Sequence, residues 1–375
     1  MTDLKFDLNR YLEELEVLVN IDSGSNYPEG VKKVADFFKK KYLEIDWLIK
    51  EHKFDDSVGP CLEIKNCEVD EYDILFIGHM DTVFPAGTVD KRPFSVQNSR
   101  AYGPGVIDMK SGLLSLYYVI NFLDIDKYKN PSFCIALNSD EEISSKFSSE
   151  WIESLAKKSK YAFVLEPARK NGALVLERKG LAKYEVEFHG IAAHAGVEPE
   201  KGASAITELG HWIVELNKLN NIEIGTTVNV GVVSGGTKAN VVADKALAEI
   251  DFRFKSKEEG EKIKVKMDEL KNNPIVSKVN IIMNRTGYRP PMNPSKETIK
   301  LCGIIEEVGE KLGIDIKWAS TGGGSDANFT SAAGTSSIDG LGPIGGNSHS
   351  ESEYLEKNSI EPRIQLLKKI IEKLI

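Results

Sequence analysis

Three apolar segments that read as buried strands each run directly into acidic or imidazole side chains. The segments are YDILFIG (72–78), SFCIALN (132–138) and YAFVL (161–165), and they are followed by His79 and Asp81, by Asp140, Glu141 and Glu142, and by Glu166. Ligands of an open parallel sheet bind beyond the carboxyl ends of its strands. We therefore expect these side chains to lie together at one edge of one sheet.

Segments before and between these strands have helical periodicity, as in 28–44 and 111–123. This alternation predicts an α/β fold, with a mixed, largely parallel sheet and helices on both faces. After residue 178 the order changes to strand, helix, strand, strand, helix, strand, which is typical of a ferredoxin-like α+β module. The sequence thus predicts one domain from 1–177 and 288–375, with a second domain inserted at 178–287.

Two further polar residues stand in glycine-rich segments, Asp108 in AYGPGVIDMKSG and His349 in GPIGGNSHSESEY. Clustered carboxylates repel one another unless a cation neutralises them, which favours a site for two metal ions. Imidazole and carboxylate ligands without thiolates suit zinc, and also manganese or cobalt. Two such ions lower the pKa of a shared water, and a carboxylate that is not a ligand can act as general base. Glu141 and Glu142 could divide these two tasks.

Charge and composition exclude several other classes of protein. Lys and Arg total 48 against 57 Asp and Glu, a formal net charge of −9, which argues against nucleic-acid or anionic-membrane partners. The charged N-terminal segment lacks the apolar core of a secretory signal, and no apolar run approaches the length of a membrane span. The four cysteines form no CxxC pair. We expect a cytoplasmic protein that acts on a small molecule or peptide.

Taken together, the motifs resemble those of metallopeptidase family 20, the aminoacylase and glutamate carboxypeptidase group of di-zinc exopeptidases. The matching motifs, in the family's order, are GHMDTV, GPGVIDMKSG, NSDEE, LEP, AAHAG, GGGSDAN and GPIGGNSHSESEYL. The resemblance covers nearly the whole chain and implies the zinc exopeptidase type of α/β fold. One departure is Ser111, where relatives commonly carry glycine.

The resemblance implies a role for each residue of the site. His79, Asp108 and Glu166 would hold one Zn²⁺ and Asp108, Glu142 and His349 the other, with Asp108 bridging the two ions of each subunit; Co²⁺ or Mn²⁺ could replace zinc. Asp81 would orient His79, since metal-bound histidines usually need such a partner. Glu141 would be the general base. The Asp108–Met109 peptide bond is expected to be cis.

The inserted domain at 178–287 would, by the same resemblance, be a lid that forms a homodimer, over a catalytic metal-binding domain. His194 would stabilise the oxyanion, within its own subunit or across the dimer; a surface-loop histidine is the alternative. Asn240 and Arg289 would bind the free carboxylate of the substrate, although Arg289 could instead form a hinge ion pair. The backbone of Gly323 and Gly324 would approach the substrate closely.

The predicted reaction is hydrolysis of an amide bond next to a free carboxylate, in a small peptide or an N-acyl amino acid. The motifs are closest to the glutamate carboxypeptidase branch. The alternative within the hydrolases is an N-acyl-amino-acid deacylase of the acetylornithine deacetylase or succinyl-diaminopimelate desuccinylase type. A hypothesis of another class is a catalytically silent metal-binding interaction protein.

Overall fold

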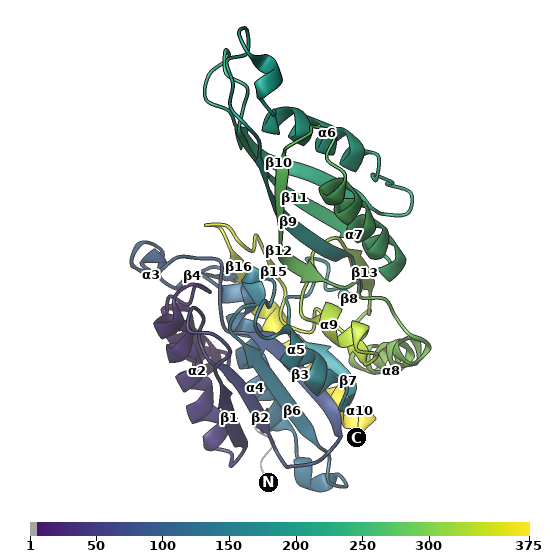
Figure 1. Ribbon diagram of the computed structural model, residues 1–375. Helices are drawn as coiled ribbons and strands as arrows, with labels where there is room; N and C mark the ends of the chain where they lie inside the picture. The colour runs from purple at the N-terminus through teal and green to yellow at the C-terminus, as the bar shows by residue number, and fades with distance from the viewer. Residues whose placement is uncertain (1–5) are drawn as a thin grey trace. The chain divides into compact units, whose positions relative to one another are not determined.

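The computed structural model describes residues 6–375 and divides the chain into two compact units (Figure 1). Unit 1 comprises Met1–Glu177, Met292–Thr321 and Ser325–Ile375, and unit 2 comprises Arg178–Pro291 with Gly322–Gly324. The glycine loop Gly322–Gly324 thus belongs to unit 2, although it lies far outside the inserted segment in sequence. Among residues 6–375, every helix is too short or too polar to traverse a lipid bilayer.

The centre of unit 1 is a six-stranded sheet with the order β1-β2-β6-β3-β7-β14. Its strands are β1 (Leu48–His52), β2 (Cys61–Lys65), β3 (Tyr72–His79), β6 (Phe133–Asn138), β7 (Ser159–Val164) and β14 (Ser336–Ile338). β3 pairs in parallel with β6 and β7, and β14 in parallel with β7, whereas β1 and β2 are antiparallel. The prediction of a mixed, largely parallel sheet is therefore confirmed.

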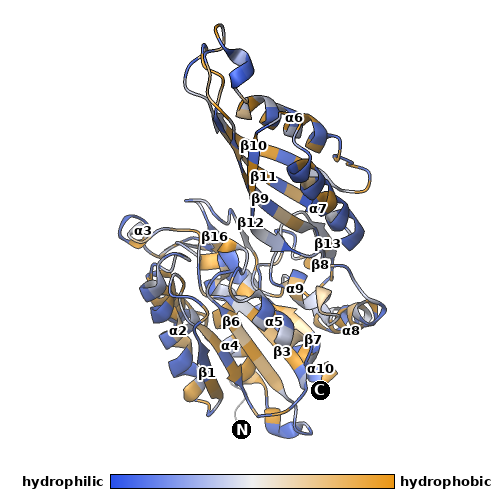
Figure 2. Ribbon diagram, in the orientation of Figure 1, coloured by the Kyte–Doolittle hydropathy of each residue, from blue (hydrophilic) through white to orange (hydrophobic). Residues whose placement is uncertain are grey.

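Side chains of β3 alternate between two hydrophobic cores, because successive residues of a strand point to opposite faces. Ile74 and Phe76 join the larger core, whereas Leu75 and Ile77 join the smaller one. The larger core is covered by helices α1 (Leu8–Val19), α2 (Pro28–Leu43), α4 (Ser111–Phe122), α8 (Lys296–Leu312) and α10 (Ile360–Leu374), and the smaller by α5 (Ser149–Ala156) and α9 (Ala327–Ala332). The central strands and α4 are accordingly the most apolar segments of the unit (Figure 2).

Short elements complete unit 1 around the edge of the sheet at which β3 ends. They are the helix α3 (Thr88–Lys91), the strands β4 (Ser95–Gln97), β5 (Arg100–Tyr102), β15 (Gly345–Gly346) and β16 (Tyr354–Glu356), and the pair β8 (Leu174–Arg178) and β13 (Trp318–Thr321). β4, β5, β16 and β15 form one small antiparallel sheet.

Unit 2 is a four-stranded antiparallel sheet with the order β10-β11-β9-β12 and two helices. In chain order its elements are β9 (Gly180–His189), α6 (Ala205–Asn217), β10 (Thr227–Gly235), β11 (Lys245–Phe254), α7 (Lys257–Asn272) and β12 (Asn280–Arg289). α6 and α7 pack on the sheet through a core of their own that includes Phe188, Trp212 and Phe252. Because no residue of that core belongs to unit 1, each unit has its own hydrophobic interior.

Candidate metal centre

His79, the last residue of β3, has its two ring nitrogens in different surroundings. Nδ1 lies 2.9 Å from the backbone oxygen of Asp81 and 3.4 Å from Oδ1 of the same residue. A carbonyl oxygen can only accept, so Nδ1 carries the proton. Nε2 is thereby directed at the carboxylates, 3.1 Å from Oδ1 of Asp108 and 3.8 Å from Oε1 of Glu166. Nε2 is therefore the nitrogen available to a metal ion.

Asp108 lies between the two histidines. Its Oδ1 faces His79, and its Oδ2 is 3.2 Å from Nε2 of His349. His349 Nε2 is also 3.2 Å from Oε2 of Glu142. One carboxylate thus has a different imidazole at each oxygen, which is the arrangement that a bridging ligand requires. The Asp108–Met109 peptide bond is cis, as expected.

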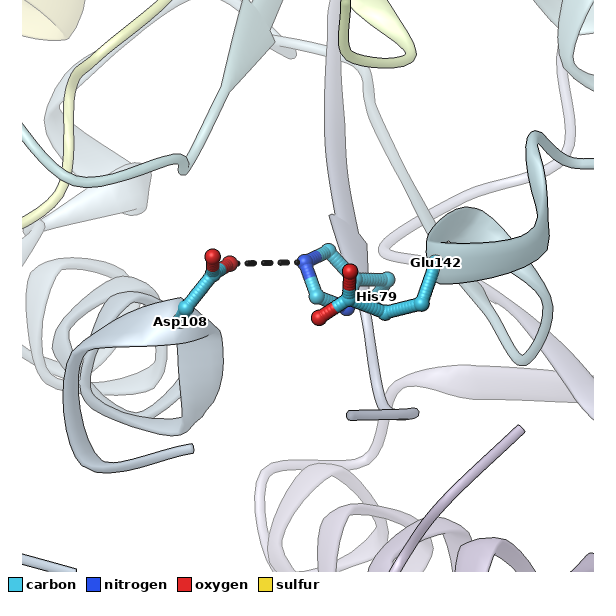
Figure 3. Close-up of side chains that lie close together, drawn as sticks. All are labelled: His79, Asp108 and Glu142. Carbon is cyan, nitrogen blue, oxygen red and sulfur yellow. Dashed lines mark hydrogen bonds and ion pairs between the residues drawn. The ribbon is translucent and has the colours of Figure 1, made fainter. Parts of the chain in front are cut away.

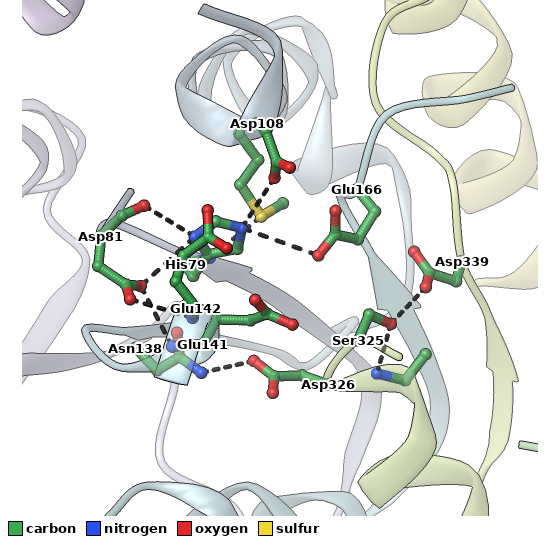
Figure 4. Close-up of polar contacts among 12 residues, drawn as sticks. His79, Asp81, Asp108, Asn138, Glu141, Glu142, Glu166, Ser325, Asp326 and Asp339 are labelled. Atoms are coloured by element: carbon green, nitrogen blue, oxygen red, sulfur yellow. Dashed lines mark hydrogen bonds and ion pairs between the residues drawn. The ribbon is translucent and has the colours of Figure 1, made fainter. Parts of the chain in front are cut away.

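Two groups of potential ligand atoms share His79. His79, Asp108 and Glu142 each offer one atom, and these atoms lie within 4.8 Å of one another, as do those of His79, Glu141 and Glu166. Figure 3 shows the first group, with Asp108 and Glu142 reaching the imidazole from opposite sides. Figure 4 shows His79, Asp81, Asp108, Glu141, Glu142 and Glu166 together, near the carboxyl ends of β3, β6 and β7. His349 joins them through Asp108 and Glu142.

The electrostatics of this cluster favour a positive charge among the carboxylates. Burial and the neighbouring Asp108 carboxylate raise the pKa of Glu166 well above its usual range. Hydrogen bonds to Asp108 and Glu142 raise the pKa of His349 to about 11. Burial opposes protonation of His79, but its bonds to Asp108 and Asp81 outweigh that effect and raise its pKa. In each case a proton lies among carboxylates that repel one another. A bound cation would reduce the same repulsion.

Glu142 supplies a separate indication of a missing partner. Its Oε1 is buried and is without a hydrogen-bond partner among residues 6–375, although its Oε2 contacts His349. An unpaired buried carboxylate oxygen is costly, and a divalent cation satisfies it. Together with a donor set of imidazoles and carboxylates only, this orphaned oxygen fits zinc, cobalt or manganese.

Asp81 contacts the backbone of Glu141 and Glu142 as well as the ring of His79. Its Oδ1 accepts the N–H of Glu141 at 3.2 Å, and its Oδ2 accepts the N–H of Glu142 at 3.1 Å. Ser25 Oγ donates to the same Oδ2 at 2.6 Å. Asp81 thus fixes both the ring of His79 and the backbone from which the two glutamates project. Sequence reasoning found only the first of these contacts, because the second depends on the turn after β6.

Glu353 is a further functional candidate that was not singled out from the sequence. It is fully buried, and its carboxylate accepts the N–H groups of Gly105, Ile107 and Asp108, each at 3.0 Å. Burial raises the pKa of Glu353 to about 7, although the three N–H groups oppose the rise. Glu353 therefore secures the loop that carries Asp108. Its only signal in the sequence is its place in HSESEY, after His349.

Asp326 performs a similar task on the other side of the cluster. It accepts Asn138 Nδ2 and Ser145 Oγ, each at 2.5 Å, and so ties the end of β6 to the residues that follow Glu142 (Figure 4). The sequence placed Asp326 in the GGGSDAN motif without a role.

The remaining predicted residues lie in unit 2. His194 pairs with Val241 in an antiparallel bridge, and the N–H of Ala195 donates to the oxygen of Asn240 at 3.0 Å, so His194 and Asn240 are neighbours. Arg289 ends β12. A Cβ on Gly324 would lie 2.6 Å from Cδ of Arg289, and Arg178 donates to the oxygens of Gly323 and Gly324. Unit 2 therefore presents two separate groups of predicted substrate-binding residues.

Comparisons with known proteins identify the family to which the chain belongs. Residues 75–373 match the model of Peptidase family M20/M25/M40. The chain is 26% identical over 368 residues to carboxypeptidase G2 of Pseudomonas sp. (strain RS-16), covering 96% of this chain and 88% of that protein. It is also 26% identical over 325 residues to succinyl-diaminopimelate desuccinylase of Wolbachia sp. subsp. Brugia malayi (strain TRS), covering 80% and 77% of the two chains.

Two solved structures share the fold along 98% of the chain. The aminopeptidase PepT from Bacillus cereus superposes with a TM-score of 0.78 at 24% identity, covering 98% of this chain and 99% of that one. The M20 family metallo-carboxypeptidase Sso-CP2 from Sulfolobus solfataricus gives 0.77 at 17% identity, with coverage of 98% and 99%. Given the family match over residues 75–373, the chain belongs to Peptidase family M20/M25/M40 and is a metal-dependent peptidase or amidohydrolase.

Proposed function

We propose that this protein hydrolyses an amide bond next to a free carboxylate, as a glutamate-carboxypeptidase-like exopeptidase. The observation that carries the proposal is the position of Glu141. It directly precedes the candidate ligand Glu142, and its N–H is held by Asp81, which also holds His79. The likeness to carboxypeptidase G2 along 96% of the chain supports the carboxypeptidase assignment.

Two zinc ions per subunit would be held by His79, Asp108 and Glu166 and by Asp108, Glu142 and His349. Bound there, they would lower the pKa of a shared water and polarise the carbonyl of the substrate. The orphaned Oε1 of Glu142 and the position of Asp108 between two imidazoles support this assignment.

Side chains of the protein would transfer the protons and hold them in place. Glu141 takes a proton from the attacking water and passes it to the nitrogen of the leaving group, as a general base that then acts as general acid. Asp81 keeps the Nδ1 proton on His79, so that Nε2 presents a lone pair. Its bonds to the N–H groups of Glu141 and Glu142 hold base and ligand in a fixed relation.

The unit 2 residues would bind the substrate. Arg289 suits a free carboxylate because its planar guanidinium can donate two parallel hydrogen bonds, and Asn240 would add a further donor. His194 would donate to the oxyanion of the tetrahedral intermediate. The backbone of Gly323 and Gly324 would line the approach. The adjacency of His194 and Asn240, and of Arg289 and Gly324, supports two such groups.

A second candidate is an N-acyl-amino-acid deacylase of the acetylornithine deacetylase or succinyl-diaminopimelate desuccinylase type. The likeness to a succinyl-diaminopimelate desuccinylase over 80% of the chain favours it. Both candidates act on peptides or acyl amino acids and use the same metal centre. They differ in the group on the carbonyl side of the cleaved bond.

We also propose a homodimer formed through unit 2, which would serve as the lid over the catalytic metal-binding unit. Exposed apolar side chains gather on α6 and the edge strand β10, which contact each other. They are Ile206, Ile213, Val214, Val232 and Val233. An apolar surface of this kind on a small unit is typical of a protein interface.

The test of the catalytic assignment is the replacement of Glu141 by Gln. Removing a general base costs about a hundredfold to ten-thousandfold in kcat. We expect Glu141→Gln to lose about a thousandfold in kcat on a panel of C-terminal glutamyl peptides and N-acetyl amino acids. Metal content, measured by mass spectrometry of the dialysed protein, should stay at two ions.

Glu150→Gln, an exposed glutamate on α5, is the matched control and should keep full activity. Unchanged turnover in Glu141→Gln would remove Glu141 from the role of base. The panel itself separates the two candidates, because a carboxypeptidase prefers the peptides and a deacylase the acetylated amino acids.

A further inference from the structure

A hollow of about 390 Å³ lies beside Glu142, on the surface of unit 1. It is lined by residues of two loops, 24–27 and 82–86, together with Glu142 and Ile143. The second loop continues directly from His79 and Asp81, so the hollow borders the metal centre through both Glu142 and this loop. Nothing in the mechanism above uses it.

The walls of the hollow are held in place by backbone contacts. Gly24 and Thr82 form a parallel bridge, with the N–H of Thr82 donating to Ser23 at 2.8 Å and the N–H of Ser25 donating to Thr82 at 3.2 Å. A Cβ on Gly24 would lie 2.5 Å from the oxygen of Phe84, so only glycine allows the two loops to approach this closely. Ser25 Oγ is bonded to Asp81. The hollow is therefore preformed and connected to the residues that hold the metal ligands.

The lining is mainly apolar and contains no cation. Its apolar side chains are Tyr27, Val83, Phe84, Pro85, Ala86 and Ile143, and its polar side chains are Ser25, Asn26 and Thr82. The only ionisable acid in the lining is Glu142, a candidate metal ligand. Arg92 lies over the ring of Phe84, 4.4 Å from its centroid, but is not among the lining residues. Among the lining side chains, an anionic group in the hollow would thus meet a carboxylate and no cation.

We propose that this hollow receives the group on the carbonyl side of the cleaved amide, and that it selects an aromatic or branched apolar group over an anionic one. The proposal rests on the proposed function, since it takes the metal centre as the place of cleavage. An aryl ring would stack against Tyr27 or Phe84 and would thereby be removed from water. A succinyl group would bring its carboxylate to the same apolar surface, whose lining includes no cationic side chain.

The experiment compares N-benzoyl-L-glutamate with N-succinyl-L-glutamate, which differ only in the acyl group. Their affinities are measured by calorimetry with the metal-loaded Glu141→Gln protein. Their kcat/KM values are measured with the enzyme that retains Glu141. We expect the benzoyl compound to bind about tenfold more tightly, because burying an aryl group contributes that much or more.

Two variants then change the hollow itself. Val83→Arg places a cation at its rim and should shift the affinity ratio toward succinyl by about tenfold, since a charged hydrogen bond is gained. Phe84→Ala should weaken benzoyl binding about tenfold and leave succinyl binding unchanged. Val17→Arg, at an exposed valine on α1, is the matched control and should change neither.

The outcomes separate the two proposals. The assignment of the hollow would be overturned by equal affinities for the two compounds or by binding of neither. It would also be overturned if Val83→Arg gave the same affinity ratio as Val17→Arg. Selective binding without hydrolysis of either compound would instead uphold the hollow and count against the proposed function.

Discussion

At the scale of single residues, Glu353 holds the loop that carries the candidate metal ligand Asp108. Its carboxylate accepts three backbone N–H groups of the loop that ends in Asp108. Replacing partners of metal ligands typically costs tenfold to a hundredfold in metal affinity. We expect Glu353→Gln, which keeps the size of the side chain but only one acceptor oxygen, to weaken zinc binding by about that factor.

Competition with a coloured zinc chelator measures this affinity, and circular dichroism reports whether the fold survives. Glu351→Gln is the control, because Glu351 is exposed and lies two residues away. An unchanged zinc affinity in a well-folded Glu353→Gln protein would limit Glu353 to a structural role. Glu353→Ala goes further, since it leaves three N–H groups without acceptors, and it should also destabilise the fold by about 3 kcal/mol or more.

The sequence indicated which residues gather at the centre, but of the contacts that hold them it indicated only that of Asp81 with His79. His79, Glu141, Glu142 and Glu166 lie at or just after the ends of apolar runs, so the positions of these runs are enough to place them at one edge of the sheet. Glu353 contacts Gly105 across a separation of 248 residues, and no local pattern encodes such a contact. The same holds for Asp326, which binds Asn138 across 188 residues.

At the scale of elements, the exposed apolar faces of α6 and β10 lead to a test of the dimer. We expect Ile213→Lys to weaken association by about 30-fold or more, equivalent to about 2 kcal/mol, because a lysine would have to be desolvated in the interface. Sedimentation velocity at several protein concentrations measures the change. Val265→Lys, at an exposed valine on α7, is the control. Monomers in the unaltered protein, or equal association of both variants, would contradict the proposal.

Long elements with a clear period were predictable, and short ones were not. The predicted strand at 72–78 corresponds to β3 at Tyr72–His79, and the predicted helix at 28–44 to α2 at Pro28–Leu43. The strand is a continuous apolar run, and the helix has apolar residues at helical spacing and a proline in its first turn. By contrast, β15 has two residues and β16 three. Strands of two or three residues are too short to show an alternation of apolar and polar residues. Their positions are set by the strands with which they pair.

At the scale of the whole molecule, the separation of the two cores predicts that metal removal acts on one unit only. Ligand binding stabilises a folded state by about 4 kcal/mol when the free ligand is a thousandfold above its Kd. We expect chelation to lower the unfolding temperature of unit 1 by about 10 °C, since 1 kcal/mol corresponds to roughly 2–4 °C at this size. Unit 2 contains none of the candidate metal ligands and should unfold at an unchanged temperature.

Hydrogen exchange followed by mass spectrometry resolves the units, with peptides of β3 and β6 reporting on unit 1 and those of β9 and β11 on unit 2. Re-addition of zinc is the control and should restore slow exchange in β3 and β6. Equal acceleration of exchange in both units would show that they unfold together.

The pairing of β9 with β12 has a consequence for how such a chain could arise. Leu181, near the start of unit 2, is the direct antiparallel partner of Arg289, near its end. Partner residues of this kind have Cα atoms only about 5 Å apart. A two-residue turn can span that gap, so everything between them amounts topologically to one long hairpin loop. An ancestral gene could therefore have acquired or lost the whole segment in a single event. The order of strands in the sheet that carries the candidate metal ligands would stay the same.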